Sequence, residues 1–200
     1  MILDFGLFRI FLFPSLFLVF SCSEPTKMPF FDADSLKIET NGGITTSAGK
    51  PISGRVFSLM SSKDTAFLIG FLNGKEQGIS KYWYENGQLS DIKSYENGHK
   101  IGVHKGWWSD GKCKYIFHFE GDEYEGNQQE WDENGRPYRD MNYHLGHEEG
   151  QQRMWYDNGQ MRSNYIIRNN RRYGLLGTKN CINVADSIPA LRNRLAIGKL

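Results

Sequence analysis

The sequence predicts an all-β protein: an extended single-layer antiparallel β-meander built from 24-residue hairpin repeats. The first observation is a set of glycines spaced 24 residues apart: Gly54, Gly78, Gly102, Gly126, Gly150 and Gly174. The second is a set of tryptophans at the same interval, with Leu59 in the equivalent position of the first unit: Trp83, Trp107, Trp131 and Trp155. The third is a glycine four residues after each tryptophan, always preceded by Asn or Asp: Gly87, Gly111, Gly135 and Gly159. Columns that share one period indicate a repeat architecture, which we assign to five units over residues 54–174.

Each unit is expected to contain two strands and two turns. The first strand runs from the leading glycine to the tryptophan, and an Asn-Gly or Asp-Gly turn follows because both residues tolerate positive φ. The second strand ends at an aromatic or apolar residue, which is Phe71, Tyr95, Phe119, Tyr143 or Ile167 in the successive units. A second turn, such as Asn73-Gly74, then leads into the next unit. The chain therefore forms a continuous meander, whose stability is a sum over neighbouring units.

The register of each hairpin depends on the length of its loop. A two-residue turn at Asn86-Gly87 places Trp83 opposite Ser90, whereas a three-residue loop over 85–87 places Trp83 opposite Leu89. We favour the longer loop because it gathers Trp83, Leu89 and Tyr95 on one face of the sheet.

Repetition of this arrangement predicts an aromatic face that is a possible binding surface. Its expected members are Trp83, Trp107, Trp131, Trp155, Tyr95, Phe119 and Tyr143. The alternative interpretation is that these rings only pack the sheet. Exposed aromatic patches are typical of contact surfaces for protein, glycan or membrane.

The N-terminal residues 1–21 have the pattern of a secretory signal peptide. Arg9 precedes an apolar stretch from Ile10 to Phe20, which is short for a membrane span. The sequence Val19-Phe20-Ser21-Cys22 resembles the lipobox of bacterial lipoproteins. This resemblance implies a lipidated Cys22 and an exported lipoprotein, anchored in a membrane at the periplasmic face or cell surface. An ordinary cleaved signal and an uncleaved membrane helix are the alternatives.

Two further segments flank the repeats. Residues 22–53 are rich in Ser, Thr, Pro, Gly and Asp, and we interpret them as a lipid-anchored tether together with the first half-repeat. Residues 175–200 do not repeat, and we expect a terminal strand and a capping tail there, because the ends of repeat arrays need a polar cap.

The units themselves resemble a known family. The segments Gly78-Ile-Ser-Lys-Tyr-Trp-Tyr-Glu-Asn-Gly-Gln-Leu89 and Gly150-Gln-Gln-Arg-Met-Trp-Tyr-Asp-Asn-Gly-Gln-Met161 are similar to the MORN-repeat variant of bacterial YwqK-type antitoxins. The similarity extends over about 50–174, with a departure in the third unit, where Gly121-Asp122 replaces Asn-Gly. The resemblance implies a β-hairpin repeat protein, and it suggests antitoxin or immunity function and membrane association.

No residue pattern in the chain is typical of an enzyme, a metal site or a cofactor site. The five histidines fall at different phases of the repeat, so stacking does not gather them. Cys113 and Cys181 are expected five strands apart, about 24 Å, and therefore remain free thiols. Cys113 is expected to act as a small hydrophobic residue.

The charge pattern narrows the range of partners. A net charge of +1 excludes the dense basic face that nucleic acid requires. We therefore expect a non-catalytic, envelope-anchored protein that presents its aromatic face to an unidentified protein partner. The alternatives are binding of an envelope glycan and an antitoxin or immunity role.

Overall fold

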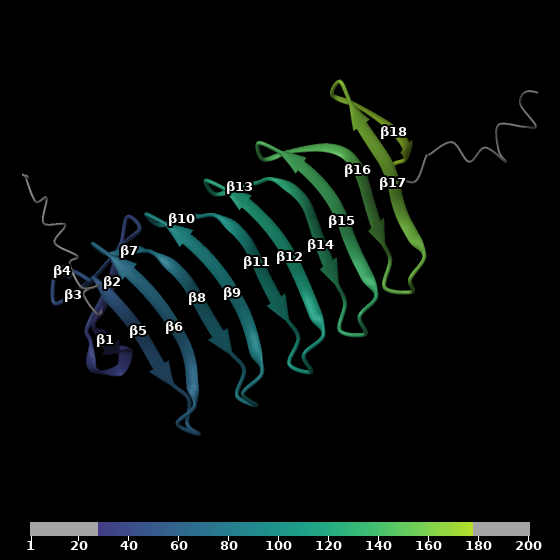
Figure 1. Ribbon diagram of the computed structural model, residues 1–200. Helices are drawn as coiled ribbons and strands as arrows, with labels where there is room; N and C mark the ends of the chain where they lie inside the picture. Colours follow the sequence, from purple (N-terminus) through teal and green to yellow (C-terminus); the bar gives the residue numbers. More distant parts are fainter. Residues whose placement is uncertain (1–27, 178–200) are drawn as a thin grey trace, which may run out of the picture.

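The computed structural model describes residues 28–177, which are almost entirely β-structure (Figure 1). A 15-stranded sheet forms an extended ribbon, in which consecutive hairpins lie side by side. Its first two repeats contain β5 (Gly54–Leu59), β6 (Thr65–Leu72), β8 (Gly78–Trp83) and β9 (Leu89–Glu96). The next two contain β11 (Gly102–Trp107), β12 (Cys113–Glu120), β14 (Gly126–Trp131) and β15 (Pro137–His144). The last strands are β16 (His147–Trp155), β17 (Met161–Arg168) and β18 (Arg171–Leu175).

These strands pair antiparallel in chain order, so the predicted all-β meander is confirmed. The short strands β7 (Lys75–Glu76), β10 (His99–Lys100) and β13 (Glu123–Tyr124) pair back onto the ends of β6, β9 and β12. The bounds of the second strand of each unit recur every 24 residues, from β6 to β17. The period in the sequence therefore corresponds to one hairpin.

The loop after each tryptophan has the three-residue form. The Tyr84 amide donates to the Gln88 carbonyl at 2.8 Å, and the Gly87 amide donates to the Tyr84 carbonyl at 2.8 Å. Gly87 has φ of 80°, in the left-handed region that glycine adopts without strain. Trp83 consequently lies opposite Leu89, so the favoured register is confirmed.

A β-bulge follows this loop in every unit. Trp83 pairs with Leu89, but Tyr82 pairs with Asp91, so β9 contributes one extra residue, Ser90. The same shift recurs between Gly106 and Trp107, between Glu130 and Trp131, and between Met154 and Trp155. An extra residue interrupts the two-residue alternation of a strand, which changes the face that later side chains occupy.

The bulge corrects the predicted aromatic face. Tyr82 pairs with Asp91 and shares a face with Lys93 and Tyr95, whereas Trp83 is the next residue of β8 and points to the opposite face. The prediction that Trp83 and Tyr95 lie on one face is therefore wrong, although Trp83 and Leu89 do lie opposite each other. The physical reason is the single inserted residue between Leu89 and Asp91.

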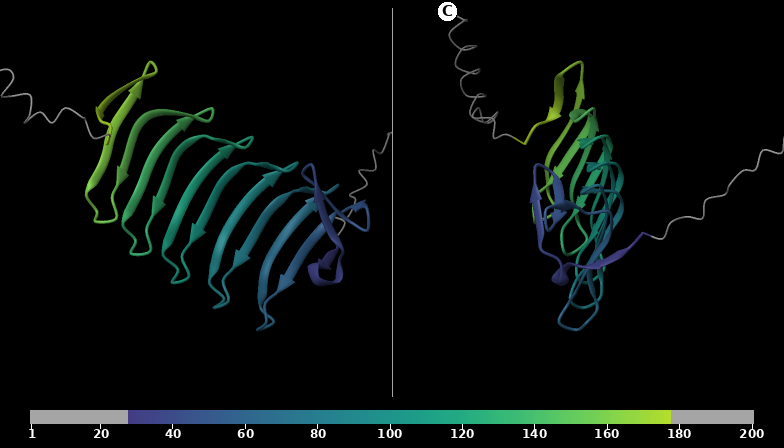
Figure 2. Two further views of the ribbon diagram at one scale, coloured as in Figure 1. Left: turned by 180° about the vertical axis from the view of Figure 1, so that it is seen from behind. Right: turned by 90° about the vertical axis from the view of Figure 1, so that its left-hand side faces the viewer.

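Residues 28–53 form a folded cap instead of the predicted tether. Strand β1 (Phe30–Asp32) pairs parallel with β5 and continues into a short 3₁₀ helix, η1 (Ala33–Ser35). The strands β2 (Ile38–Asn41), β3 (Ile44–Ser47) and β4 (Lys50–Pro51) then form a separate three-stranded sheet. In Figure 2 this sheet lies on one side of the ribbon, at its N-terminal end. The Ser- and Thr-rich composition reflects strand residues around a Gly42-Gly43 turn, and not a tether.

A cluster of buried apolar side chains lies between this cap and the first hairpin. It consists of Ile52, Val56 and Phe71, with the half-buried Phe31 and Phe67 packed against them. Burial of an aliphatic or aromatic side chain of this size contributes about 1.5–3 kcal/mol. The cap therefore closes the N-terminal end of the sheet with a second layer.

Several predictions concern residues outside the described range. The signal segment 1–21, the lipidation site Cys22, the greater part of the tail 175–200 and Cys181 all belong to this group. Within residues 28–177, no helix has the length and apolar character needed to cross a membrane.

Candidate interaction surface

One face of the sheet carries a row of aromatic side chains that extends from β6 to β15 and includes β13. We call this surface the aromatic face, and its rings belong to Phe67, Tyr82, Tyr95, Tyr115, Phe117, Phe119, Tyr124 and Tyr143. They share a face because they occupy alternate positions of paired strands. Seven of the eight rings, Tyr82 to Tyr143, lie on strands from β8 to β15. All are half-buried, so each keeps part of its surface in contact with solvent.

The rings contact one another both along β12 and across neighbouring strands. The Tyr115 and Phe117 rings are stacked with centroids 4.5 Å apart, and the Phe119 and Tyr124 centroids are 4.9 Å apart. Tyr124 in turn lies 5.2 Å from Tyr143, and the imidazole of His104 lies 4.6 Å from Phe119. Aromatic pairs at these separations contribute about 0.5–1.5 kcal/mol beyond their burial. The row is therefore a continuous packed surface.

A shallow hollow of about 320 Å³ lies at the centre of the aromatic face, among Tyr95, Tyr115, Phe117, Phe119 and Tyr124. Two lysines border it. The Lys100 ammonium lies 5.2 Å from the Phe119 centroid, and the Lys93 ammonium lies 4.9 Å from the Tyr82 centroid. Both distances are in the range of cation–π contacts. The hollow thus combines aromatic walls with cationic edges.

The tyrosine hydroxyls of this face are neutral at physiological pH. Burial raises the pKa of Tyr82 to about 12, and the nearby Glu76 and Asp91 carboxylates act in the same direction. Burial and a hydrogen bond to Asp91 also raise the pKa of Tyr115, whose hydroxyl donates to that carboxylate. The phenols therefore add hydrogen-bonding groups to the face without adding charge.

A column of buried polar residues holds neighbouring units together beneath the aromatic face. Its members occupy the third position of the second to fifth repeats: Ser80, His104, Gln128 and Gln152. The Gln152 amide donates to the carbonyls of Asn142 (2.7 Å) and Glu149 (3.0 Å), and its oxygen accepts from the Asn142 amide. Gln128 binds the backbone of His118 in the same way. The Gln128 and Gln152 side chains take the place of hydrogen bonds between strands where adjacent hairpins diverge, and so satisfy buried backbone groups. The buried Ser80 hydroxyl makes no hydrogen bond to any residue that the structure describes.

The His104 side chain also forms a hydrogen bond to the backbone of the neighbouring unit. Its Nε2 donates to the Ser94 carbonyl at 2.9 Å, and the residue is almost fully buried. Burial lowers the pKa of His104, an effect that the Ser94 hydrogen bond opposes. The imidazole is therefore neutral in the folded protein at pH 7.

The tryptophans lie on the opposite face, which we call the tryptophan face. Trp83, Trp107, Trp131 and Trp155 are half-buried and pair with Leu89, Cys113, Pro137 and Met161. Cys113 has no disulfide partner among residues 28–177, and burial raises the pKa of its thiol. The turn glycines Gly111, Gly135 and Gly159, with φ of 80–85°, set the loops between these pairs.

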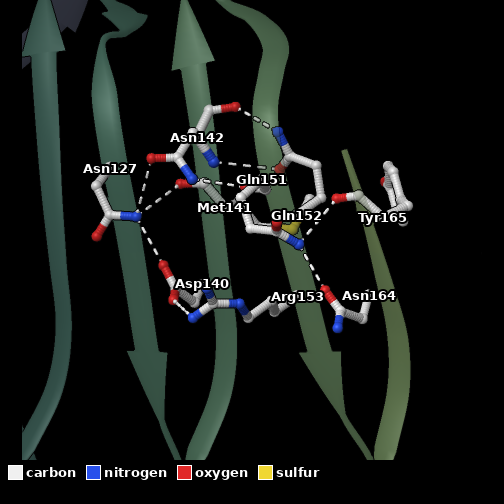
Figure 3. A network of polar contacts seen from close by, with 9 residues as sticks. All are labelled: Asn127, Asp140, Met141, Asn142, Gln151, Gln152, Arg153, Asn164 and Tyr165. Atoms are coloured by element: carbon white, nitrogen blue, oxygen red, sulfur yellow. Dashed lines mark hydrogen bonds and ion pairs between the residues drawn. The ribbon is translucent and has the colours of Figure 1, made fainter. Parts of the chain in front are cut away.

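In the C-terminal half, the tryptophan face is a network of amides and charges (Figure 3). Asn127 donates to Asp140 at 2.7 Å, and Gln151 donates to Asn164 at 2.5 Å. The Arg153 guanidinium pairs with Asp140 at 3.3 Å. These groups bind one another across neighbouring strands, so the tryptophan face is polar in this part of the sheet.

Among the sequence-predicted surface residues, Tyr95, Phe119 and Tyr143 lie on the aromatic face and the four tryptophans do not. Sequence reasoning missed Phe67, Tyr82, Tyr115, Phe117 and Tyr124, which complete that face. Tyr115 and Phe117 precede Phe119 at two-residue spacing, which in a strand indicates that the three rings share one face, so the sequence could have identified them. Tyr82 was hidden because its face depends on the bulge.

Charged side chains pair between units at the edge of the ribbon. His99 Nδ1 lies 2.6 Å from Asp122 Oδ2, and His144 Nδ1 lies 3.0 Å from Glu125 Oε1. His144 is also directly opposite His147 in the β15–β16 ladder. In the part of the chain that the structure describes, no three His, Cys, Asp or Glu side chains are grouped so that they could hold a metal ion.

The fold and this surface define a β-hairpin repeat protein with two chemically different faces. Two of its segments, residues 76–97 and 148–165, match the family model described as MORN repeat variant. These segments contain the β8–β9 hairpin and most of the β16–β17 hairpin, and the match supports the MORN-repeat character of the units. No curated protein in the comparison matches the chain.

Proposed function

We propose that this protein is a non-catalytic interaction module whose aromatic face binds another protein. The observation that carries the proposal is the row of half-buried rings over β8 to β15, which no other layer covers within residues 28–177. Contiguous apolar surfaces of this kind on soluble domains are typical of binding sites. Tyrosine is also enriched at protein interfaces, because it combines a large apolar ring with a hydroxyl.

The N-terminal cap supports the proposal from within the chain. Over β5 and β6, the aromatic side of the sheet is covered by polypeptide, with Ile38 and Thr45 facing Val56 and Phe71. The face can therefore accept a peptide segment as a second layer. Beyond the first hairpin the same face is free to accept one from a partner.

Site-specific photocrosslinking tests which face binds. A photoreactive phenylalanine analogue replaces Tyr124 on the aromatic face or, as the matched control, Tyr138 on the tryptophan face. We expect one discrete crosslinked product from cells that carry the probe at Tyr124, and none from cells that carry it at Tyr138. Adding Phe119→Ser to the Tyr124 probe should abolish this product. Adducts from Tyr138 alone, or none from Tyr124, would contradict the proposal.

Anchoring at the cell envelope through a lipidated Cys22 is a further part of the proposal, supported by the lipobox-like sequence. Two or more acyl chains on one cysteine give stable membrane attachment. Cys22→Ala is expected to abolish metabolic palmitate labelling and to move the protein to the soluble fraction. Continued membrane association of the unlabelled variant would place the anchor elsewhere.

Binding of an envelope glycan is the second candidate, and the central hollow favours it. The stacked Tyr115 and Phe117 rings offer a platform for a sugar ring, and Lys93 and Lys100 offer donors beside it. This function predicts retention of the protein on purified peptidoglycan or envelope polysaccharide, with loss in Phe117→Ser. Absence of retention would remove it. An antitoxin role, which the family resemblance alone suggests, predicts a toxin gene adjacent to the gene of this protein.

A further inference from the structure

A cavity lies between the cap and the first hairpin, apart from the central hollow of the aromatic face. Its volume is about 420 Å³, within the range of small-molecule sites. One wall comes from the cap, with Ile38, Thr40 and Thr45. The opposite wall comes from Val56, Phe67, Ile69 and Phe71 of β5 and β6, and Glu76 of β7 lies at its border. The cavity thus lies between two layers of the same chain and is partly open to solvent.

The side chains of the first repeat leave this space open. At the third position of the repeat the first unit has Val56, where the third to fifth units have the larger His104, Gln128 and Gln152 and the second unit has the smaller Ser80. At the sixteenth position it has Ile69, where the third and fifth units have Phe117 and Tyr165. The backbone of the repeat therefore accommodates bulkier residues at both positions. The smaller side chains of the first unit leave room for the cavity beneath the cap.

The cavity has few polar groups, and they are specific. The hydroxyls of Thr40 and Thr45 lie 3.1 Å apart and bind each other across β2 and β3. The Glu76 carboxyl lies near Lys93, Lys100 and the Tyr95 hydroxyl. Burial raises the pKa of Glu76, an effect that these three neighbours oppose. A ligand that covers this carboxyl further must supply a hydrogen-bond donor to it, because an unpaired buried carboxylate is costly.

We propose that the cavity binds a neutral amphiphile: an apolar chain that packs between Ile38 and the Val56, Phe67 and Ile69 side chains, with a hydroxyl that donates to Glu76. A headgroup of either charge is disfavoured, because it would lose its hydration in a mainly apolar space where Lys93 and Lys100 already balance the Glu76 charge and leave no partner for it. The site is independent of the partner surface, since it is lined by the cap and not by the uncovered strands.

Calorimetric titration of the full-length protein with three probes of equal chain length tests the headgroup. The probes are 1-dodecanol, dodecanoate and dodecyltrimethylammonium, each below its aggregation concentration. We expect dodecanol to bind at least about tenfold more tightly than either ion, a difference of about 1.4 kcal/mol. No binding of dodecanol, or tighter binding of an ion, would overturn the assignment.

Two variants locate the site. Ile69→Phe fills the cavity with a ring that the same repeat position accepts in the third unit, and we expect it to abolish dodecanol binding. Met141→Phe, at the same repeat position outside the cavity, is the matched control and should bind as the wild type does. Unchanged binding in Ile69→Phe, or loss in Met141→Phe, would contradict the site.

Glu76→Gln keeps the shape of the cavity and tests the polar contact even if Ile69→Phe does not fold. We expect Glu76→Gln to bind dodecanol about tenfold more weakly than the wild type does, because a hydroxyl bonds an uncharged amide oxygen less strongly than a carboxylate. An unchanged affinity for dodecanol would show that Glu76 does not contact the headgroup, and would overturn this part of the proposal.

Discussion

The ring of Tyr115 on β12 lies over Gly106 on β11, in the space that a side chain on Gly106 would occupy. Because β11 offers no side chain there, Tyr115 reaches across it and donates its hydroxyl to Asp91 on β9. The same orientation stacks Tyr115 on Phe117. One glycine thus determines how the centre of the aromatic face is arranged.

Gly106→Ala should displace the Tyr115 ring and break its bond to Asp91. We expect a loss of about 1–3 kcal/mol in the free energy of unfolding, the usual effect of overpacking. Urea denaturation measures it. In a Tyr115→Ala background the same substitution should cost much less, and an equal cost in both backgrounds would show that the two residues do not compete for space.

Gln152→Met should remove the side-chain bridge between β15 and β16. Two backbone groups of Asn142 then lose their partner in a fully buried position, and each such loss costs about 1–3 kcal/mol. Gln151→Met, on the opposite and partly exposed face, is the control and should cost less because water can replace its bonds. If the two variants unfold at the same urea concentration, the bridge does not stabilise the sheet.

His104 is expected to make the stability of the protein pH-dependent below about pH 6.5. Its pKa is lowered in the folded state, mainly by burial, from a value of 6.5 in the unfolded chain. The stability contributed by the neutral ring is complete above pH 6.5, and it is lost as the pH falls through the folded-state pKa. His104→Gln introduces the residue that the fourth unit has at this position, Gln128. We expect the melting temperature of this variant to fall less between pH 7 and pH 5 than that of the wild type. Parallel pH profiles for the two proteins would contradict the assignment.

Gly111→Val should strain the three-residue loop between β11 and β12. Gly111 has φ of 85°, and a β-branched residue there costs about 1–3 kcal/mol. Gly111→Asn is the control, since asparagine tolerates this conformation and should cost less. A melting temperature of Gly111→Val equal to that of the wild type would mean that the loop is assigned incorrectly.

The repeat, the strands and the loops could be predicted from the sequence because local chemistry determines them. Asn-Gly and Asp-Gly pairs define the turns, and the 24-residue spacing places each tryptophan opposite its partner, as Trp83 and Leu89 demonstrate. The bulge at Ser90 could not be predicted, because it depends on the pairing between strands and leaves no mark on the period. That one residue moved the tryptophans off the aromatic face.

The cap and the buried polar column were missed for a different reason. The Ser- and Thr-rich segment around Thr40 and Thr45 has the composition of a linker, and only its packing against Val56 and Phe71 distinguishes it from one. Gln152 and His104 belong to residue types that are mostly exposed, so nothing in the sequence marks them as buried. Tertiary contacts, not local preference, decide both features.

Electron spin resonance distances between loop positions test the side-by-side arrangement of the hairpins most directly. Spin labels are attached at Glu85 and at one of its exposed repeat equivalents, Ser109, Glu133 or Asp157, after replacement of the native cysteines by serine. With strands about 4.8 Å apart, each added unit should lengthen the distance by about 10 Å, so that the three pairs form an even series. Distances that do not increase with the number of intervening units would contradict the ribbon of identical hairpins on which the two faces depend.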